Sequence, residues 1–284
     1  MAKLETVEYV EVRILSDNSV LPGARGMLGE HGFSALLESC GESVLFDTGQ
    51  TGIPLVNNLK LLGIYKVEDV VLSHGHYDHS GGLPALISAG LTPSRIFTHE
   101  DAFRRRYKRI RGQTVEIGLP YQASLLESAG VEVAFSSAPV KVKGWLTTTG
   151  EVERSSFERP ETEFLIERNG GKVRDGFRDD MGIIVSVEGK GLVVVTGCAH
   201  SGVINTVRHA MKITGIDRIY AVIGGFHLNE VSETTIRSTV EGLKALGAAK
   251  IVPCHCTGSD ALSRMSQEMG ETVTRGGVGL RLRL

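Results

Sequence analysis

The sequence contains no apolar run that approaches the roughly 20 residues of a membrane-spanning helix. Its first residues, MAKLETVEYVEVRIL, include no apolar segment of the kind found in signal peptides. Only four cysteines occur in 284 residues, which argues against a disulfide framework. We therefore expect a cytoplasmic protein with reduced thiols and no membrane partner.

The chain also lacks a strong excess of charge of either sign. Its formal net charge is -2, so the total does not favour nucleic acid as a partner. Neither an internal repeat nor a low-complexity tract is present. With 41% hydrophobic and 23% charged residues, the composition is that of a globular protein, and we predict one domain spanning residues 1–284. The sequence does not indicate an oligomeric state.

Short apolar segments that alternate with amphipathic ones predict an α/β fold. The 35 glycines lie mainly where short strands would turn. Residue composition predicts strands at 9–15, 34–39, 43–49, 67–73, 95–99, 216–227 and 250–255, and a hairpin at 179–200. Helical spacing predicts helices at 53–64, 81–90, 201–215, 232–247 and from about 259, with Ser232 as an N-cap.

Between residues 101 and 162 this pattern weakens. FRRRYKRIRG (103–112) is rich in arginine, and SSFERPETE (155–163) has the composition of a loop. The stretch holds too few apolar residues to form a core of its own. We predict that 101–162 is an inserted lid over one face of the domain.

Histidine is concentrated in one stretch and at the ends of predicted strands. VVLSHGHYDHSGG (70–82) crowds three histidines and an aspartate into six positions. Of nine histidines, seven follow a predicted strand: His74, His76, His79, His99, His200, His227 and His255. Because strand ends of an α/β sheet meet in one crevice, we expect these side chains to lie together. A polar surface loop is the alternative, but it does not explain histidines at the ends of separate strands.

Imidazole nitrogen and carboxylate oxygen are ligands for Zn, Mn and Fe. In an extended segment His74 and His76 point the same way, and after a turn Asp78 and His79 point at a neighbouring position. One motif can therefore serve two divalent ions, each completed by ligands from elsewhere. Such ions lower the pKa of bound water to about 7 and so supply a nucleophile. We expect two divalent ions, zinc by preference, with manganese and iron as alternatives.

SHGHYDHSGG, with FDTG upstream, resembles the metallo-β-lactamase superfamily. The resemblance covers most of the chain and implies a four-layer αββα sandwich with a metal site at one edge. It implies that His74 and His76 bind a first metal, that Asp78 and His79 bind a second, and that Asp47 supports the site. TGCAHSGVIN, IGGFHL and PCHCTG further resemble the dihydropterin-(ribofuranosyl)aminobenzene-phosphate synthase branch.

The sequence departs from the lactamase and glyoxalase II patterns at two points. It lacks the PGHT segment that supplies a first-site histidine, and we assign that position to His200. His255 takes the final second-site position. Cys198 stands where the family has a metal-bridging aspartate. Its thiolate either bridges the metals or packs as a small buried side chain.

Other residues are candidates for catalysis or substrate binding. We assign catalytic roles to Asp78 and to His227, which either binds substrate or acts as a general acid. His99 either lines the site or is an ordinary strand-end histidine, and His31 either lies at the rim or in a loop. If the lid folds over the crevice, its basic run can clamp a phosphate through Arg104, Arg105 and Arg106. Otherwise this run is a solvated face.

These features favour a metal-dependent hydrolase that uses activated water on a phosphorylated or phosphodiester-type small molecule. A pterin-related synthase is the specific version that the resemblance implies. The alternative is a metal-containing ligand-binding or sensor protein without turnover, which the missing bridging aspartate favours. The partner we expect is therefore a phosphorylated small molecule and not nucleic acid.

Overall fold

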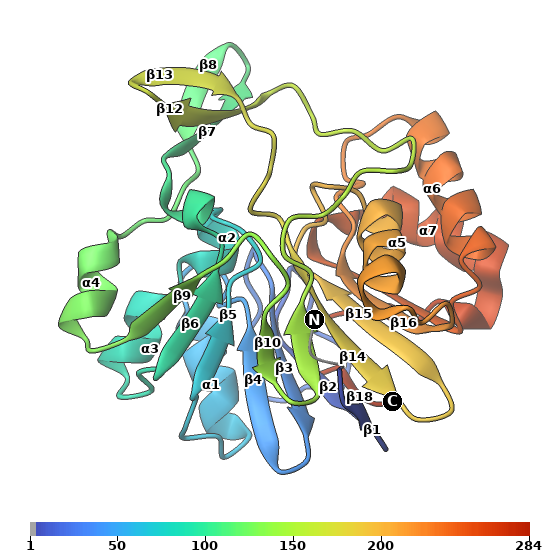
Figure 1. Ribbon diagram of the computed structural model, residues 1–284, viewed down its shortest axis with the longest axis horizontal. Coiled ribbons are helices and arrows are strands. Elements are labelled where there is room, and N and C mark those ends of the chain that lie inside the picture. Colours follow the sequence, from blue (N-terminus) through green and yellow to red (C-terminus); the bar gives the residue numbers. More distant parts are fainter. Residues whose placement is uncertain (1–3) are drawn as a thin grey trace.

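Two large sheets pack face to face in the centre of the molecule, and helices cover their outer faces (Figure 1). The computed structural model describes residues 4–284. The first sheet has the order β18 (Arg281–Arg283), β2 (Glu11–Ser16), β3 (Ser34–Ser39), β4 (Glu42–Phe46), β5 (Asp69–Val71), β6 (Arg95–Thr98) and β9 (Glu132–Phe135). The second has the order β10 (Lys141–Lys143), β11 (Leu146–Thr148), β14 (Gly182–Val187), β15 (Gly191–Thr196), β16 (Ile219–Gly225) and β17 (Lys250–Cys254), with β1 (Thr6–Val7) beside β14.

Helices on each side complete a helix–sheet–sheet–helix sandwich, the α/β architecture that the sequence predicts (Figure 1). One side carries α1 (Ile53–Leu61), α3 (Leu83–Ser88) and α4 (Ala123–Ser128). The other carries α5 (Val203–Thr214), α6 (Glu233–Ala245) and α7 (Ser259–Met269). The remaining helical turns are α2 (Tyr77–Ser80), η1 (Glu100–Phe103), η2 (His255–Thr257) and η3 (Gly270–Thr272). As predicted, Ser232 caps α6, accepting a hydrogen bond from Thr235 N.

Three apolar layers hold the sandwich together. Between the sheets, residues of the first such as Ile14 and Phe46 pack against residues of the second such as Ile183. The outer layers join each sheet to its helices, for example through Leu55 of α1 and Val207 of α5. Strands β14 and β15 are buried on both faces, which explains their nearly continuous apolar sequences.

A third, four-stranded sheet stands above the edge of the sandwich (Figure 1). This small sheet has the order β13 (Gly171–Arg174), β12 (Phe164–Arg168), β7 (Arg106–Ile110) and β8 (Gln113–Glu116). The range 101–162 is therefore not one inserted loop. Its basic run forms β7, whereas β9, β10 and β11 belong to the two large sheets, and the small sheet continues to residue 174.

The strand boundaries decide where polar side chains emerge. Strand β4 ends at Phe46, so Asp47 lies in a left-handed turn (φ 59°) and not in the strand predicted at 43–49. Strands β4, β5 and β6 are parallel, as are β15, β16 and β17, and their carboxyl ends face the small sheet (Figure 1). Within residues 4–284, no helix is long and apolar enough to cross a membrane.

Candidate metal centre

The carboxyl ends of strands from both large sheets deliver side chains to one place. His74 follows β5, Cys198 and His200 follow β15, and His255 follows β17 directly. Helix α2 begins directly after His76 and carries Asp78 and His79 in its single turn. All six predicted metal ligands are buried, although they come from distant parts of the sequence: His74, His76, Asp78, His79, His200 and His255.

His74, His76 and His200 form the first cluster, with one ligand atom of each within 4.8 Å of the others. His200 Nε2 lies 3.2 Å from His76 Nδ1. His74 Nε2 is buried and has no hydrogen-bond partner among the described residues. An unsatisfied buried nitrogen costs about 1–3 kcal/mol, so this atom fits a ligand of a divalent ion. Burial lowers the pKa of all three imidazoles well below the usual value, which favours the neutral form that binds metals.

Asp78, His79 and His255 form the second cluster. Asp78 Oδ2 lies 3.3 Å from His255 Nε2 and 4.0 Å from His79 Nε2, and the two Nε2 atoms are 3.3 Å apart. His31 lies at the rim, with Nε2 3.2 Å from Asp78 Oδ2. Burial alone lowers the pKa of His79, but Asp47 and Asp78 outweigh it and raise the pKa to about 9. The second cluster therefore attracts positive charge.

Cys198 lies between the two clusters. Its Sγ is 3.0 Å from His79 Nε2, and it falls within 4.8 Å of ligand atoms of both His74 and His255. Burial raises the pKa of the thiol well above its usual value. The side chain thus occupies the position expected of a bridging ligand, and a metal would have to stabilise its thiolate form.

Polar groups behind the ligands orient several imidazoles. Asp47 accepts hydrogen bonds from Ser73 N, Ser73 Oγ and His79 Nδ1, each at 2.7 Å. Ser73 Oγ also lies 2.9 Å from His74 Nδ1. Asp47 therefore supports both clusters, and in His74 and His79 the Nε2 atom remains directed at the centre.

His255 is oriented by two residues that the sequence reasoning missed. Asp17 Oδ2 accepts a hydrogen bond from His255 N at 2.7 Å, and Asn18 Oδ1 accepts one from His255 Nδ1 at 2.8 Å. Both residues directly follow β2. That position, a polar pair after an apolar strand, is the signal that could have identified them.

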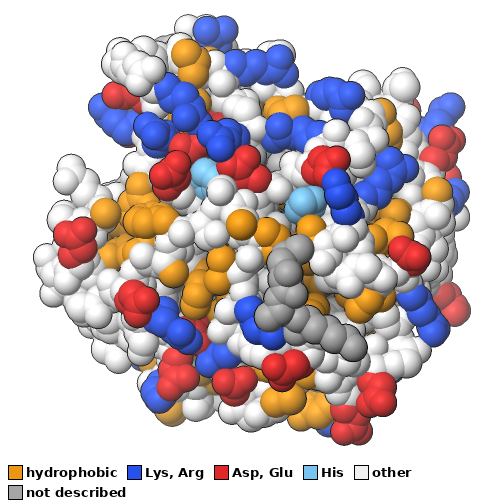
Figure 2. Space-filling view, in the orientation of Figure 1, with side chains coloured by type: hydrophobic (Ala, Val, Ile, Leu, Met, Phe, Trp, Pro, Cys, Tyr) orange, Lys and Arg blue, Asp and Glu red, His pale blue; other side chains and the backbone are white. Residues whose placement is uncertain are grey.

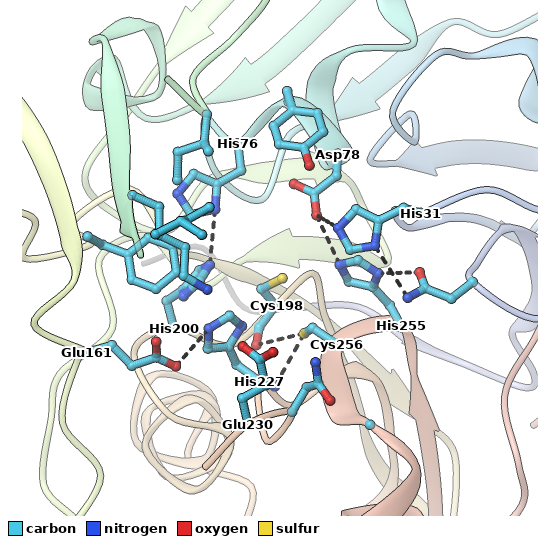
Figure 3. A pocket seen from close by; sticks show the side chains of 18 residues that line it. His31, His76, Asp78, Glu161, Cys198, His200, His227, Glu230, His255 and Cys256 are labelled. Atoms are coloured by element: carbon cyan, nitrogen blue, oxygen red, sulfur yellow. Dashed lines mark hydrogen bonds and ion pairs between the residues drawn. The ribbon is translucent and has the colours of Figure 1, made fainter. Parts of the chain in front are cut away.

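A cavity of about 330 Å³ opens above the two clusters (Figure 3). His227 lines it, and its Nε2 lies 3.0 Å from Glu161 Oε1. Burial alone lowers the pKa of His227, but Cys256 and Glu161 outweigh it and raise the pKa to about 10. Cys256 also lines the cavity.

The small sheet forms one wall of this cavity. Lys108, Ile110 and Phe164 line it, and Lys108 Nζ lies 4.9 Å from the centre of the Phe164 ring. Other lysines and arginines gather on the outside of the small sheet, at the top of Figure 2. The sequence places Lys108 within the basic run but does not single it out, because only the register of β7 distinguishes it from its neighbours.

The four predicted substrate-binding residues lie elsewhere. His99 is buried beside Glu151, and its Nδ1 accepts a hydrogen bond from Asp101 N. The three arginines do not line the cavity as predicted, because each has an acidic partner away from it. Arg104 pairs with Asp101, and Arg105 pairs with Glu116. Arg106 is fully buried against Asp175 and Asp179. The predicted contact between the basic run and the site is therefore made by Lys108.

The sequence model of the metallo-beta-lactamase superfamily matches residues 28–255. The chain belongs to this superfamily. It is 34% identical to 7,8-dihydropterin-6-methyl-4-(beta-D-ribofuranosyl)-aminobenzene-5'-phosphate synthase of Methanocaldococcus jannaschii over 260 residues, 87% of each protein. It is 37% identical to an uncharacterised protein of that organism over 257 residues, which cover 90% of this chain and 94% of the relative.

Among solved structures, Tm1679 resembles the chain over nearly its whole length. The two share 32% sequence identity and a TM-score of 0.83, covering 97% of this chain and 99% of Tm1679. Tm1679 is described as a metal-dependent hydrolase of the beta-lactamase superfamily. The fold and the clustered donors therefore agree with a divalent-metal protein, and the named relatives support an enzyme.

Proposed function

We propose that this protein is a cytoplasmic enzyme that uses two divalent ions to act on a phosphorylated small molecule. The observation that carries the proposal is the arrangement of two buried donor clusters beneath one cavity. His74, His76 and His200 would hold the first ion. Asp78, His79 and His255 would hold the second, with Cys198 between the two.

Zinc is the ion that this donor set favours. Imidazole, carboxylate and thiolate are all established zinc ligands, and thiolate is a poor ligand for magnesium or calcium. Divalent ions bound here would supply Lewis acidity, which polarises a phosphoryl group and lowers the pKa of bound water to about 7. Manganese and iron are the alternatives that metal analysis distinguishes.

The residues around the cavity account for substrate binding and proton transfer. The ammonium group of Lys108 holds a phosphate oxygen, and Phe164 supports the lysine from below. His227 donates a proton to the leaving group, and Glu161 fixes the orientation of the His227 ring. Asp78 also lines the cavity, so its carboxylate is placed to accept a hydrogen bond from an attacking water.

Hydrolysis of a phosphodiester-type bond is the general form of the proposal. The pterin-related synthase is its narrower form, and the support for it is the similarity to the named synthase over 87% of both chains. The two forms differ in the molecule that accepts the transferred group, which is water in hydrolysis and a second organic substrate in the synthase reaction. A sensor without turnover would keep the same clusters and bind the ligand only.

Turnover of bis(p-nitrophenyl) phosphate by zinc-loaded protein tests the hydrolytic form. We expect turnover that His227→Asn and Asp78→Ala each abolish. His209→Ala, which alters a half-buried histidine on α5, should retain the wild-type rate and serves as the control. Binding of phosphorylated pterin or aminobenzene compounds without hydrolysis would instead favour the synthase, and metal binding without any turnover would favour the sensor.

A further inference from the structure

A short segment, 175–181, contacts the backbone on both sides of the first-cluster histidines. Met181 N donates a hydrogen bond to Ser73 O at 3.0 Å, directly before His74. Asp179 Oδ2 accepts one from Gly75 N at 2.9 Å, between His74 and His76. The segment therefore fixes the course of the chain through both ligands of the histidine motif.

The same segment also holds His200. Asp180 Oδ2 accepts a hydrogen bond from Ser201 N at 2.7 Å, directly after the ligand. The Phe177 ring stacks on the His200 ring, with centroids 4.1 Å apart and planes inclined by 7°. Phe177 adopts a left-handed backbone conformation (φ 48°), which is uncommon for an aromatic residue. All three histidines of the first cluster thus depend on one seven-residue segment.

Arg106 of the small sheet holds this segment in place. Its guanidinium is fully buried, donates from Nε to Asp175 Oδ2 at 2.8 Å, and pairs through Nη2 with Asp179 Oδ1 at 2.6 Å. The guanidinium also packs closely on residues 74–76, which we call the ligand loop. A Cβ added at Gly75 would lie only 2.4 Å from Arg106 Nη1. A planar, two-armed cation is suited to join two carboxylates in this way.

The second cluster is held by other parts of the chain. His79 is oriented by Asp47, and His255 by Asp17 and Asn18. The loss of Arg106 should therefore affect the two clusters unequally. If the ion pairs of Arg106 served only to attach the small sheet, their loss would weaken metal binding at both clusters equally or at neither.

We propose that Arg106 is a positioning residue that holds segment 175–181 against His74, His76 and His200 and so sets the metal affinity of the first cluster. The proposal rests on the metal centre of the proposed function. It also links substrate binding to metal binding, because Arg106 and the cavity residue Lys108 lie in the same strand, β7. Groups that orient metal ligands typically contribute about 10- to 100-fold to metal affinity.

The test is calorimetric titration of metal-free protein with Co²⁺, carried out in two backgrounds. His255→Ala leaves the first cluster intact, and His200→Ala leaves the second. Arg106→Met should weaken Co²⁺ binding by about 10- to 100-fold in the first background and by less than about threefold in the second. Arg106→Lys, which keeps the charge but not both arms, should restore part of the loss.

Arg105→Met is the matched control. Its side chain precedes Arg106, is exposed and pairs only with Glu116 among the carboxylates described, so it should change neither affinity. Equal weakening in both backgrounds, or none in either, would overturn the proposal. If Arg106→Met does not fold, the Asp179→Asn variant provides the test, because it keeps the ion pair between Arg106 and Asp175. An unchanged Co²⁺ affinity of the first cluster in that variant also overturns the proposal.

The outcomes separate this inference from the proposed function. A wild-type protein that binds no Co²⁺ would overturn the metal centre and this inference with it. A wild-type protein that binds two Co²⁺ ions, with binding undiminished in the Arg106→Met variant, would overturn the role of Arg106 alone.

Discussion

Replacing Gly75 with alanine tests how closely the ligand loop is packed. Gly75 lies between His74 and His76, and a Cβ at this position would be 2.0 Å from Ala102 O and 2.4 Å from Arg106 Nη1. Ordinary contact begins at about 3.4 Å, so the loop or the carbonyl must move by about 1.4 Å. The carbonyl belongs to backbone and not to a flexible side chain, so the displacement falls largely on the ligands.

Overpacking of this kind costs about 1–3 kcal/mol of stability. A misplacement of about 1 Å at reacting groups costs on the order of 100-fold in rate. We therefore expect Gly75→Ala to lower the free energy of unfolding of metal-free protein by about 1–3 kcal/mol, and turnover of metal-loaded protein by on the order of 100-fold. Urea unfolding followed by circular dichroism gives the first quantity, and steady-state kinetics the second.

Gly171→Ala is the control for this substitution. A Cβ at Gly171 would have Arg168 O as its nearest neighbour, at 3.8 Å, so we expect stability within about 0.5 kcal/mol of wild type and unchanged turnover. If Gly75→Ala behaved like this control, the ligand loop would be free to shift without consequence. Close packing around Gly75 would then not position His74 and His76.

Three further predictions concern single side chains. Lys108→Met should raise KM for a phosphorylated substrate about 10- to 100-fold with little change in kcat, since a charged hydrogen bond contributes about 1.5–3 kcal/mol, whereas Arg105→Met should alter neither constant in steady-state assays. Cys198→Ser should abolish the thiolate-to-cobalt charge-transfer absorption of cobalt-loaded protein, and Cys40→Ser, at an exposed thiol, should retain it. Burial raises the pKa of Asp179 to about 6 despite the opposing effect of Arg106. Folded protein therefore holds this proton more tightly than unfolded protein, so as pH rises from about 4 to 6 the metal-free wild type should lose about 2 kcal/mol of stability relative to Asp179→Asn, as measured by guanidinium unfolding.

The metal ligands could be predicted because they follow apolar strands directly. His74, His200 and His255 each come within four residues of a strand end, and parallel strands bring such positions to one edge. The position of Cys198 between the clusters follows from the same rule. Sequence alone cannot show whether its thiol binds metal, because that depends on an ion as well as on the chain.

The small sheet could not be predicted because its strands do not alternate between apolar and polar residues. In β7, Tyr107 and Lys108 point to opposite faces, and Lys172 of β13 lies over the Tyr107 ring at 3.8 Å. Its partner strand β12 is distant in sequence and pairs with β7 only in the folded chain. Charged two-sided strands of this kind give no periodic signal.

The burial of Arg106 could not be predicted from composition. Arginine is seldom fully buried, so a basic run indicates a solvated face or an anion site. Here Asp175 and Asp179 supply the compensating charges from a separate segment. The burial of the guanidinium is therefore a property of the tertiary structure, and it is Lys108, two residues further along β7, that lines the cavity.

The number of metal ions in protein purified without chelator decides whether both clusters bind metal. We expect two divalent ions per chain in the wild type, and one in each of the His200→Ala and His255→Ala variants, because each variant disrupts one cluster. One ion or none in the wild type, or two ions retained in both variants, would contradict the assignment of two metal clusters.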